Sequence, residues 1–482
     1  MTDRTDTLLG GPGQSGVDLL LSFQSVLGQV FGDHYNFVSF DPRGVNNSGL
    51  SLDCFSGNAE ARSAFGRLHS SGTTNVSSTS FEKQYYSSSI YGEWCNNAVE
   101  KGKSPYGYYV TTPAVARDLL TFIEAQAKGA GQPPSKAKLW CYGVSYGTVI
   151  GSTFASMFPD RVERMILDGV LNAEQYYDNN WRDNVDRMDE TMEKFSSFCH
   201  SAGPSNCPFW GPTPDNITAR MDSIIYDLQS HPVPISGVQD GGLPTMATYS
   251  DLKAALLDAI YNPVANFPLM ANILHQFERG NVSGLVGYFA SYANSTSNDR
   301  LAIQCADSYR TNKLTTIEEF KSYVEYTVSK SKYIGDIYPI YQDSILCRSF
   351  RPQLPDSMSV HGMQSLLFFF FFLSFFFFFY GKRPVPRVLL FSYFSIRPTP
   401  PSTTGFGARR DLTPRVSSFV GECLWSSHIL IRLGRISPGD CWMFWASLRG
   451  LWLDFSCVLK TEHGAGSQVA GNSILYSLHC HD

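Results

Sequence analysis

The sequence has no excess of positive charge and no internal repeat. Lys and Arg number 38 against 43 Asp and Glu, which gives a formal net charge of −5 over 482 residues. A nucleic-acid surface needs clustered cations to displace the counterions of phosphates, so we expect no nucleic-acid partner. Coiled coils and solenoids are excluded because the chain lacks heptads and any repeat of about 20–50 residues.

Signals for export and for membrane insertion are also missing. Before residue 10 there is no basic segment followed by an apolar core and a small-residue cleavage site, so we expect no signal peptide in this chain. The longest apolar run begins at Leu366, ends at Tyr380 and contains ten Phe among 15 residues. A membrane-spanning helix needs about 20 apolar residues. We therefore expect no membrane partner, and an anchor at this run is the weaker alternative.

The composition changes sharply near the end of the chain. Residues 363–482 carry 11 Lys and Arg against 6 Asp and Glu, and they hold 16 of the 34 Phe and 4 of the 8 Trp. Phe codons contain only pyrimidines, so a polypyrimidine tract would be translated as the Phe-rich run. We interpret residues 356–482 as an aberrant Phe-rich, basic tail that is disordered or arises from a translated intron or a shifted frame. Removing residues 363–482 should then not lower solubility.

Seven cysteines precede the tail. Cys141 lies in an apolar segment and is expected to be a buried thiol. The other six cysteines allow many pairings, of which we consider one: Cys54–Cys95, Cys199–Cys207 and Cys305–Cys347. Such disulfides, together with Asn-x-Ser/Thr sequons, are modest evidence for a secreted glycoprotein. The sequons begin at Asn46, Asn75, Asn216, Asn281 and Asn294.

Short apolar runs alternate with helical patterns up to about residue 175. Residues 37–40, 138–142 and 164–167 have the composition of buried strands, and Thr112-Pro113 is typical of a helix start. Strands that alternate with helices predict a mostly parallel sheet with helices on both faces. From about 175 to 300 the pattern becomes helical, which suggests an insertion over the sheet.

One pentapeptide carries recognisable chemistry. Gly143-Val144-Ser145-Tyr146-Gly147 fits the pattern G-x-S-x-G and lies between an expected strand and an expected helix. That context is what a nucleophile elbow requires, because a sharp turn presents the serine hydroxyl above the sheet. A plain turn between strand and helix is the alternative without function.

A second glycine-rich segment, Gly10-Gly-Pro-Gly-Gln-Ser-Gly16, lies near the start of the chain. In α/β-hydrolases such a loop supplies a backbone N–H to the oxyanion hole. It lacks the Gly-Lys-Ser/Thr ending of a phosphate-binding loop. A flexible linker is the alternative.

These segments together resemble a known family. The two glycine-rich motifs, Phe40-Asp-Pro-Arg-Gly-Val45, Arg164-Met-Ile-Leu-Asp-Gly-Val170 and Ala302-Ile-Gln-Cys-Ala-Asp307 are similar to those of tripeptidyl-aminopeptidase-like α/β-hydrolases, which are related to prolyl aminopeptidases. The resemblance covers roughly residues 8–350, and the C-terminal quarter does not match. It implies a secreted serine exopeptidase that removes short peptides or single residues from free N-termini.

The resemblance also implies site residues. Ser145 is the expected nucleophile, and the backbone N–H groups of Gly11 and Tyr146 are the expected oxyanion hole. Asp41, Arg43 and Asp168 are expected to be structural. We predict no cofactor and no metal.

The family's triad acid and base have no counterpart that we can identify in this chain. The acid normally lies in an Asn-Thr-x-Asp-Pro-Val-Thr-Pro-like segment and the base in a Gly-His loop, and neither pattern occurs here. The terminal His479-Cys480-His481-Asp482 is an isolated cluster and a weak candidate for a metal site. The triad acid and base therefore stay unassigned.

The predicted organisation is an α/β-hydrolase core with an α-helical cap, incomplete at both edges of the sheet. Residues 1–175 form the core with the oxyanion loop and the elbow, 176–300 the cap, 301–355 a return to the core, and 356–482 the tail. The predicted substrate is a peptide or a small acyl compound. A catalytically dead remnant with a binding role, and an esterase- or lipase-like hydrolase, are the alternatives.

Overall fold

The computed structural model describes most of the chain before residue 356 and five short stretches after it. The described residues are 4–32, 35–49, 53–55, 57–70, 72–74, 79–101, 107–236, 244–282, 284–285, 298–355, 358, 387–391, 430–435, 442–448 and 451–454. The chain divides into two compact units, Met1–Tyr393 and Phe394–Asp482.

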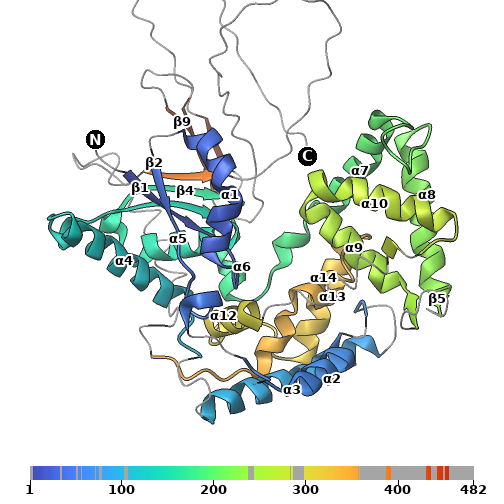
Figure 1. Cartoon of the computed structure of the whole chain (residues 1–482), viewed down its shortest axis with the longest axis horizontal. Helices are drawn as coiled ribbons and strands as arrows, with labels where there is room; N and C mark the ends of the chain where they lie inside the picture. Colours follow the sequence, from blue (N-terminus) through green and yellow to red (C-terminus); the bar gives the residue numbers. More distant parts are fainter. Residues whose placement is uncertain are drawn as a thin grey trace, which may run out of the picture. The chain divides into compact units, whose positions relative to one another are not determined.

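A five-stranded parallel sheet organises the first unit (Figure 1). The strand order is β2-β1-β3-β4-β7, and all neighbouring strands are parallel. The strands are β1 (Arg4–Leu9), β2 (Tyr35–Val38), β3 (Leu139–Val144), β4 (Val162–Asp168) and β7 (Arg387–Phe391). Strands β2, β3 and β4 confirm the three strands expected from the apolar runs, with bounds shifted by a few residues.

Side chains of β3 alternate between two hydrophobic clusters, as the period of a strand requires. Leu139 and Cys141 belong to the large core cluster, which also contains Ile150 of α5 (Tyr146–Met157). Tyr142 and Val144 instead pack against Leu19 and Leu27 of α1 (Gly16–Phe31). The sheet is therefore covered on both faces, as expected for the α/β-hydrolase fold.

The helices beside the sheet begin at sequence signals that favour helix starts. Helix α4 (Thr112–Gly129) has Pro113 in its first turn, where the missing N–H costs nothing. Helix α1 begins after Ser15, whose hydroxyl accepts a hydrogen bond from the Asp18 N–H. Helix α6 (Ala173–Tyr177) follows β4.

Four helices of the range 176–300 pack together (Figure 1, green to yellow-green). They are α7 (Met188–Ala202), α8 (Pro214–Ser230), α9 (Tyr249–Tyr261) and α10 (Pro263–Glu278). A short antiparallel hairpin, β5 (Val233–Ile235) with β6 (Thr245–Ala247), joins α8 to α9. The helical character predicted for this range is present in its described residues.

The remaining helices of the first unit come from two distant parts of the chain. They are α2 (Ala59–His69), α3 (Ser80–Glu100), α12 (Asn298–Ser308), α13 (Ile317–Lys330) and α14 (Tyr338–Gln342). The 3₁₀ helices are η1 (Asn46–Ser48), η2 (Pro134–Lys136), η3 (Pro159–Arg161), η4 (Arg182–Val185) and η5 (Ser344–Ser349). Helix α3 packs along both α2 and η5.

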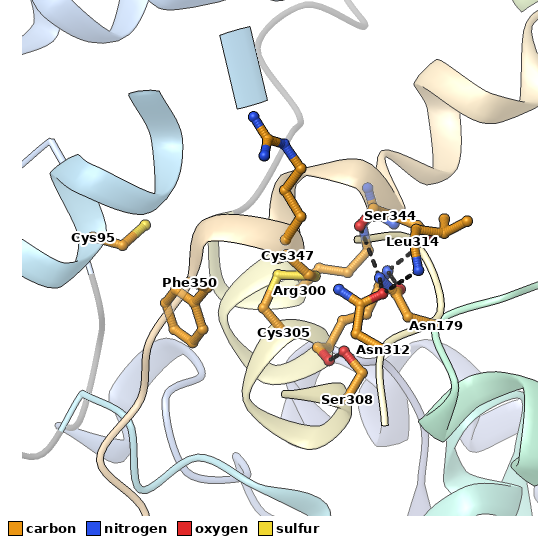
Figure 2. The surroundings of a disulfide bond; sticks show 12 residues. Cys95, Asn179, Arg300, Cys305, Ser308, Asn312, Leu314, Ser344, Cys347 and Phe350 are labelled. Carbon is orange, nitrogen blue, oxygen red and sulfur yellow. Dashed lines mark hydrogen bonds between the residues drawn. A yellow bond between two sulfur atoms is a disulfide. The ribbon is translucent and has the colours of Figure 1, made fainter. Parts of the chain in front are cut away.

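Three disulfides tie these segments together, in the pairing that the sequence suggested. Cys54–Cys95 joins the segment before α2 to α3, Cys199–Cys207 closes the end of α7, and Cys305–Cys347 joins α12 to η5. Figure 2 shows the last of these. Cys141 is buried in β3 and takes part in none of the three, as expected.

Two strands of the sheet differ from the sequence prediction. Residues 4–9 form β1, which lies between β2 and β3 and was not among the strands expected from the apolar runs. Residues 387–391 form β7 beside β4, within the range interpreted as a tail. Both segments are rich in Leu, Val or Thr, which favour strands, but their partners lie far away in the sequence. The sequence analysis identified neither segment as a strand.

The second unit contains a three-stranded antiparallel sheet. Its order is β10-β9-β8, formed by β8 (Leu430–Arg435), β9 (Trp442–Leu448) and β10 (Leu451–Asp454). Among the described helices, none has the length and apolarity needed to cross a membrane. The Phe-rich run from Leu366 to Tyr380 lies outside the described residues, as does the terminal cluster from His479 to Asp482.

Candidate active site

Ser145 occupies the sharp turn between β3 and α5. Its backbone is in a conformation with φ +55° and ψ −121°, which non-glycine residues rarely adopt. The Ser145 N–H donates to the Asp168 carbonyl at 3.0 Å. The Ser145 carbonyl accepts from the Thr148 N–H at 2.9 Å and from Thr148 Oγ1 at 2.6 Å. Hydrogen bonds to the N–H and to the carbonyl of Ser145 therefore stabilise the turn, which allows the strained backbone at this residue to persist.

Gly143 allows β3 and α5 to approach each other at this turn. A Cβ atom on Gly143 would lie 2.5 Å from the carbonyl oxygen of Gly147. No side chain fits at that distance, so residue 143 has to be glycine. The first glycine of the pattern G-x-S-x-G thus has a steric reason in this fold.

The glycine-rich loop that follows β1 lies against the residue after Ser145. Gly11 has φ +113°, and a Cβ atom there would lie 3.3 Å from Cδ1 of Tyr146. On the other side of the loop, a Cβ atom on Gly13 would lie 2.5 Å from the backbone nitrogen of Arg300 in α12. Gly11 and Tyr146, the two predicted donors to an oxyanion, are therefore neighbours.

Asp41 joins the end of this loop to the segment after β2 through hydrogen bonds. Its carboxylate accepts from the Ser15 hydroxyl at 2.5 Å, from the Asn47 N–H at 3.2 Å and from the Val17 N–H at 3.5 Å. Burial opposes its ionisation, but these hydrogen bonds hold the pKa of Asp41 below its usual value. The contacts agree with the structural role expected for Asp41.

Arg43 and Asp168 also make contacts of a structural kind. Arg43 forms a two-pronged ion pair with Asp118 of α4, with Nε to Oδ2 at 2.5 Å and a second contact to Oδ1 at 2.7 Å. The Asp168 carboxylate accepts from the Tyr142 hydroxyl at 2.7 Å, on the neighbouring strand. Both pairs join adjacent elements of the core.

Asp307 is a buried carboxylate that sequence reasoning singled out only as part of a motif. It lies in α12, is 6 % exposed and accepts hydrogen bonds from the Thr112 N–H, the Thr112 hydroxyl and the Tyr176 hydroxyl. Burial raises its pKa to about 7, and these hydrogen bonds only partly oppose the shift. In the sequence, Asp307 is marked only by its place at the end of the motif Ala302–Asp307, two residues after Cys305.

Within the described residues, no side chain hydrogen-bonds to the Ser145 hydroxyl. Three described histidines bind elsewhere: His69 contacts Ser87 and Asp343, His200 contacts the Gly211 carbonyl, and His231 contacts Asp227. The described residues contain no group of three or more His, Cys, Asp or Glu side chains that could hold a metal ion.

Comparisons with known proteins agree with this geometry. The family described as alpha/beta hydrolase fold matches residues 9–205, which include the glycine-rich loop and the elbow. A tripeptidyl aminopeptidase of Streptomyces coelicolor is 31 % identical over 165 residues, which cover 34 % of this chain and 27 % of the relative. Residues 9–205 therefore match the alpha/beta hydrolase fold, and part of the chain is similar to a tripeptidyl aminopeptidase.

Two other relatives extend the similarity. The serine protease Hip1 of Mycobacterium tuberculosis is 28 % identical over 263 residues, which cover 53 % of this chain and 45 % of Hip1. YuaR of Escherichia coli, named as a hydrolase, is 24 % identical over 335 residues, 68 % of this chain and 58 % of YuaR. The matches thus span about half the length of these relatives or less. These relatives are named as a serine protease, a hydrolase and an aminopeptidase.

Proposed function

We propose that this α/β-hydrolase is a serine peptidase that releases short peptides or single residues from free N-termini through an acyl-enzyme at Ser145. The observation that carries the proposal is the strained turn at Ser145, between β3 and α5, with the Gly11 loop beside Tyr146. Relatives named serine protease and tripeptidyl aminopeptidase support the substrate class.

In the proposed reaction, Ser145 Oγ attacks the carbonyl carbon of the scissile peptide bond. The negative charge that develops on the carbonyl oxygen is stabilised by the N–H groups of Gly11 and Tyr146, and by the positive end of α5. Collapse of the intermediate expels the amine of the remaining peptide, and water then hydrolyses the ester at Ser145. Both steps need a general base, which removes the proton from the attacking hydroxyl or water and then returns it to the leaving group, the amine in the first step and Ser145 Oγ in the second.

The other parts of the chain have proposed roles as well. Residues 1–175 would form the catalytic core, the helices within 176–300 a cap that encloses the amino end of the substrate, and 301–355 a return to the core. Secretion is supported by the three disulfides and by sequons at the exposed Asn46 and Asn281.

A non-catalytic binding protein is the second candidate. The observation that favours it is that no described side chain hydrogen-bonds to the Ser145 hydroxyl and that the described histidines named above bind elsewhere. A serine without a base is a poor nucleophile. An esterase would use the same elbow and oxyanion hole, and would differ only in its substrates.

The first experiment is sequencing of the spliced transcript across the codons for residues 345–390. A message without the Phe-rich run that encodes an Asp-Pro-Val-Thr-Pro-like segment downstream would support the complete peptidase. A mature message that keeps the run would support the binding protein.

A fluorophosphonate probe then tests the serine in each product. We expect negligible labelling of the 482-residue chain, and rapid labelling of the complete product that Ser145→Ala abolishes. Cleavage of a tripeptide amide with a free N-terminus, but not of its N-acetyl form or of a simple ester, supports the aminopeptidase over the esterase. Strong Ser145-dependent labelling of the 482-residue chain would show that it already contains a base.

A further inference from the structure

Three elements of the core meet at the side chain of Asp307, and a fourth is joined to them through Thr112. The carboxylate comes from α12, and its partners come from the start of α4 and from α6. Oδ1 accepts from the Thr112 N–H at 2.7 Å, and Oδ2 accepts from Thr112 Oγ1 at 2.5 Å and from the Tyr176 hydroxyl at 2.8 Å. The Thr112 hydroxyl in turn lies 2.7 Å from the hydroxyl of Tyr146 in α5.

Thr112 links Asp307 to Tyr146, because its hydroxyl hydrogen-bonds to both side chains. It is the first residue of α4, so its N–H has no partner within the helix, and the carboxylate satisfies it. An ionised carboxylate can only accept hydrogen bonds. The Thr112 hydroxyl therefore donates to Asp307 and accepts from Tyr146, which fixes the direction of the whole chain of hydrogen bonds.

Tyr146 is the residue whose backbone N–H is proposed to stabilise the oxyanion. Its side chain is 1 % exposed, and its ring lies 5.5 Å from that of Tyr176, centroid to centroid. Its ring also lies against the Gly11 loop, which carries the other proposed donor. A shift of the Tyr146 side chain would therefore disturb both donors.

The attachment of α12 is itself well fixed. The disulfide between Cys305 and Cys347 holds α12 to η5 (Figure 2), and Gln304 of α12 donates hydrogen bonds to Asn179 Oδ1 at 2.8 Å and to Ser344 Oγ at 3.2 Å. Asp307 therefore projects from a rigid support toward the elbow.

We propose that Asp307 is a positioning residue of the acyl-transfer site: through Thr112 it fixes Tyr146, and with it the backbone N–H that faces the developing oxyanion. This inference rests on the function proposed above. The positioning role explains why the core contains a carboxylate at this place, although an apolar side chain would cost less to bury.

The protonation state of Asp307 provides a way to observe this coupling. The titratable side chains that face it are Tyr146 from α5 and Tyr176 and Tyr177 from α6. Burial raises the pKa of each of these tyrosines far above its usual value, so they stay neutral. A proton added to Asp307 near pH 7 would allow it to donate, and the hydrogen bond between Thr112 and Tyr146 would change.

The test uses the full chain labelled with tyrosine carrying ¹³C at Cζ, with the Tyr146 signal assigned from Tyr146→Phe. We expect this signal to shift with a midpoint near pH 7 in the unsubstituted chain, and to lose that titration in Asp307→Asn and Thr112→Val. Thr112→Ser keeps the hydroxyl, so the Tyr146 signal should still titrate in this variant. A Tyr146 signal that does not titrate, or that titrates equally in Thr112→Val, would overturn the proposal.

Thr153→Val is the matched control. Thr153 is also buried, lies in α5 and hydrogen-bonds to a tyrosine hydroxyl, that of Tyr177, at 2.7 Å. It makes no hydrogen bond to Asp307 or Tyr146. The titration of Tyr146 should therefore persist in this variant, and its loss would indicate a general effect of core substitution.

A second readout separates this inference from the proposed function. In the product that reacts with the fluorophosphonate, Asp307→Asn and Thr112→Val should lower the rate of Ser145 labelling about tenfold to a hundredfold, and Thr153→Val should not. Unchanged labelling in both variants contradicts the positioning role. If no product is labelled, the proposed function fails while the tyrosine signal still tests the hydrogen-bonded chain.

Discussion

At the scale of single residues, the most informative side chains are those whose partners are distant in the sequence. Thr112 and Asp307 are separated by 195 residues, yet two hydrogen bonds join them. No local pattern predicts such a pair, because neither residue type is unusual at a helix start or in a helix. The elbow at Ser145 is the opposite case, since all its parts lie within five residues.

The burial of Asp307 predicts a dependence of stability on pH. Its pKa rises from an ordinary value of 3.8 to about 7 in the folded chain. Folding therefore favours the protonated form, so the contribution of Asp307 to stability is complete below about pH 4 and is lost as the pH rises to about 7. Relative to the parent chain, Asp307→Asn should gain on the order of a few kcal/mol between pH 4 and pH 8.

Urea unfolding at several pH values measures this difference. Asp160→Asn serves as a control for the same substitution at the surface, because Asp160 is exposed in η3. If the stability of Asp307→Asn and that of the parent chain changed with pH in the same way, folding would not shift the pKa of Asp307.

At the scale of elements, the approach of β3 to α5 determines the shape of the elbow. The carbonyl of Gly147, in the first turn of α5, occupies the space that a side chain at residue 143 would need. A parallel strand that feeds directly into a helix needs such small residues at the turn, because the two backbones touch.

Gly143→Ala should therefore destabilise the chain by about 1–3 kcal/mol, since a methyl group would force the backbones apart. Gly66→Ala is the matched control: Gly66 lies in α2, and a Cβ atom there would have no neighbour within 4 Å. This second change should stabilise the chain by about 0.5–1 kcal/mol. Urea unfolding of both variants checks the opposite signs, and equal effects would contradict the steric explanation.

At the scale of the whole molecule, the division of the chain does not follow the change in composition. The first compact unit ends at Tyr393, so it includes β7, which pairs with β4 over five residues. The sequence predicts that removal of residues 363–482 leaves solubility unchanged. The pairing of β7 indicates instead that such a deletion exposes the edge of β4.

Two truncated chains distinguish these expectations. A chain of residues 1–393 keeps β7 and should unfold within about 1 kcal/mol of the full chain, because the two units are compact separately. A chain of residues 1–362 lacks β7 and should be less stable and aggregate more, as light scattering and urea unfolding would show. Equal behaviour of both truncated chains would mean that β7 adds nothing to the core.

The sequence by itself determined the local features of this protein. The strand, turn and helix around Ser145 could be predicted because apolar runs, glycines and a Pro at a helix start act over a few residues. The pairing of six cysteines agreed with the structure, but it was one choice among several. The resemblance to aminopeptidase-like α/β-hydrolases rested on these same short motifs.

Only the tertiary structure decided which distant segments meet. It placed residues 4–9 and 387–391 in one sheet, because strand pairing joins backbones that carry no mark of their partners. It also brought Asp307 to Thr112 and Tyr146, where burial shifts the pKa of the carboxyl group. Such effects depend on the complete packing around a residue, and the order of residues along the chain does not reveal them.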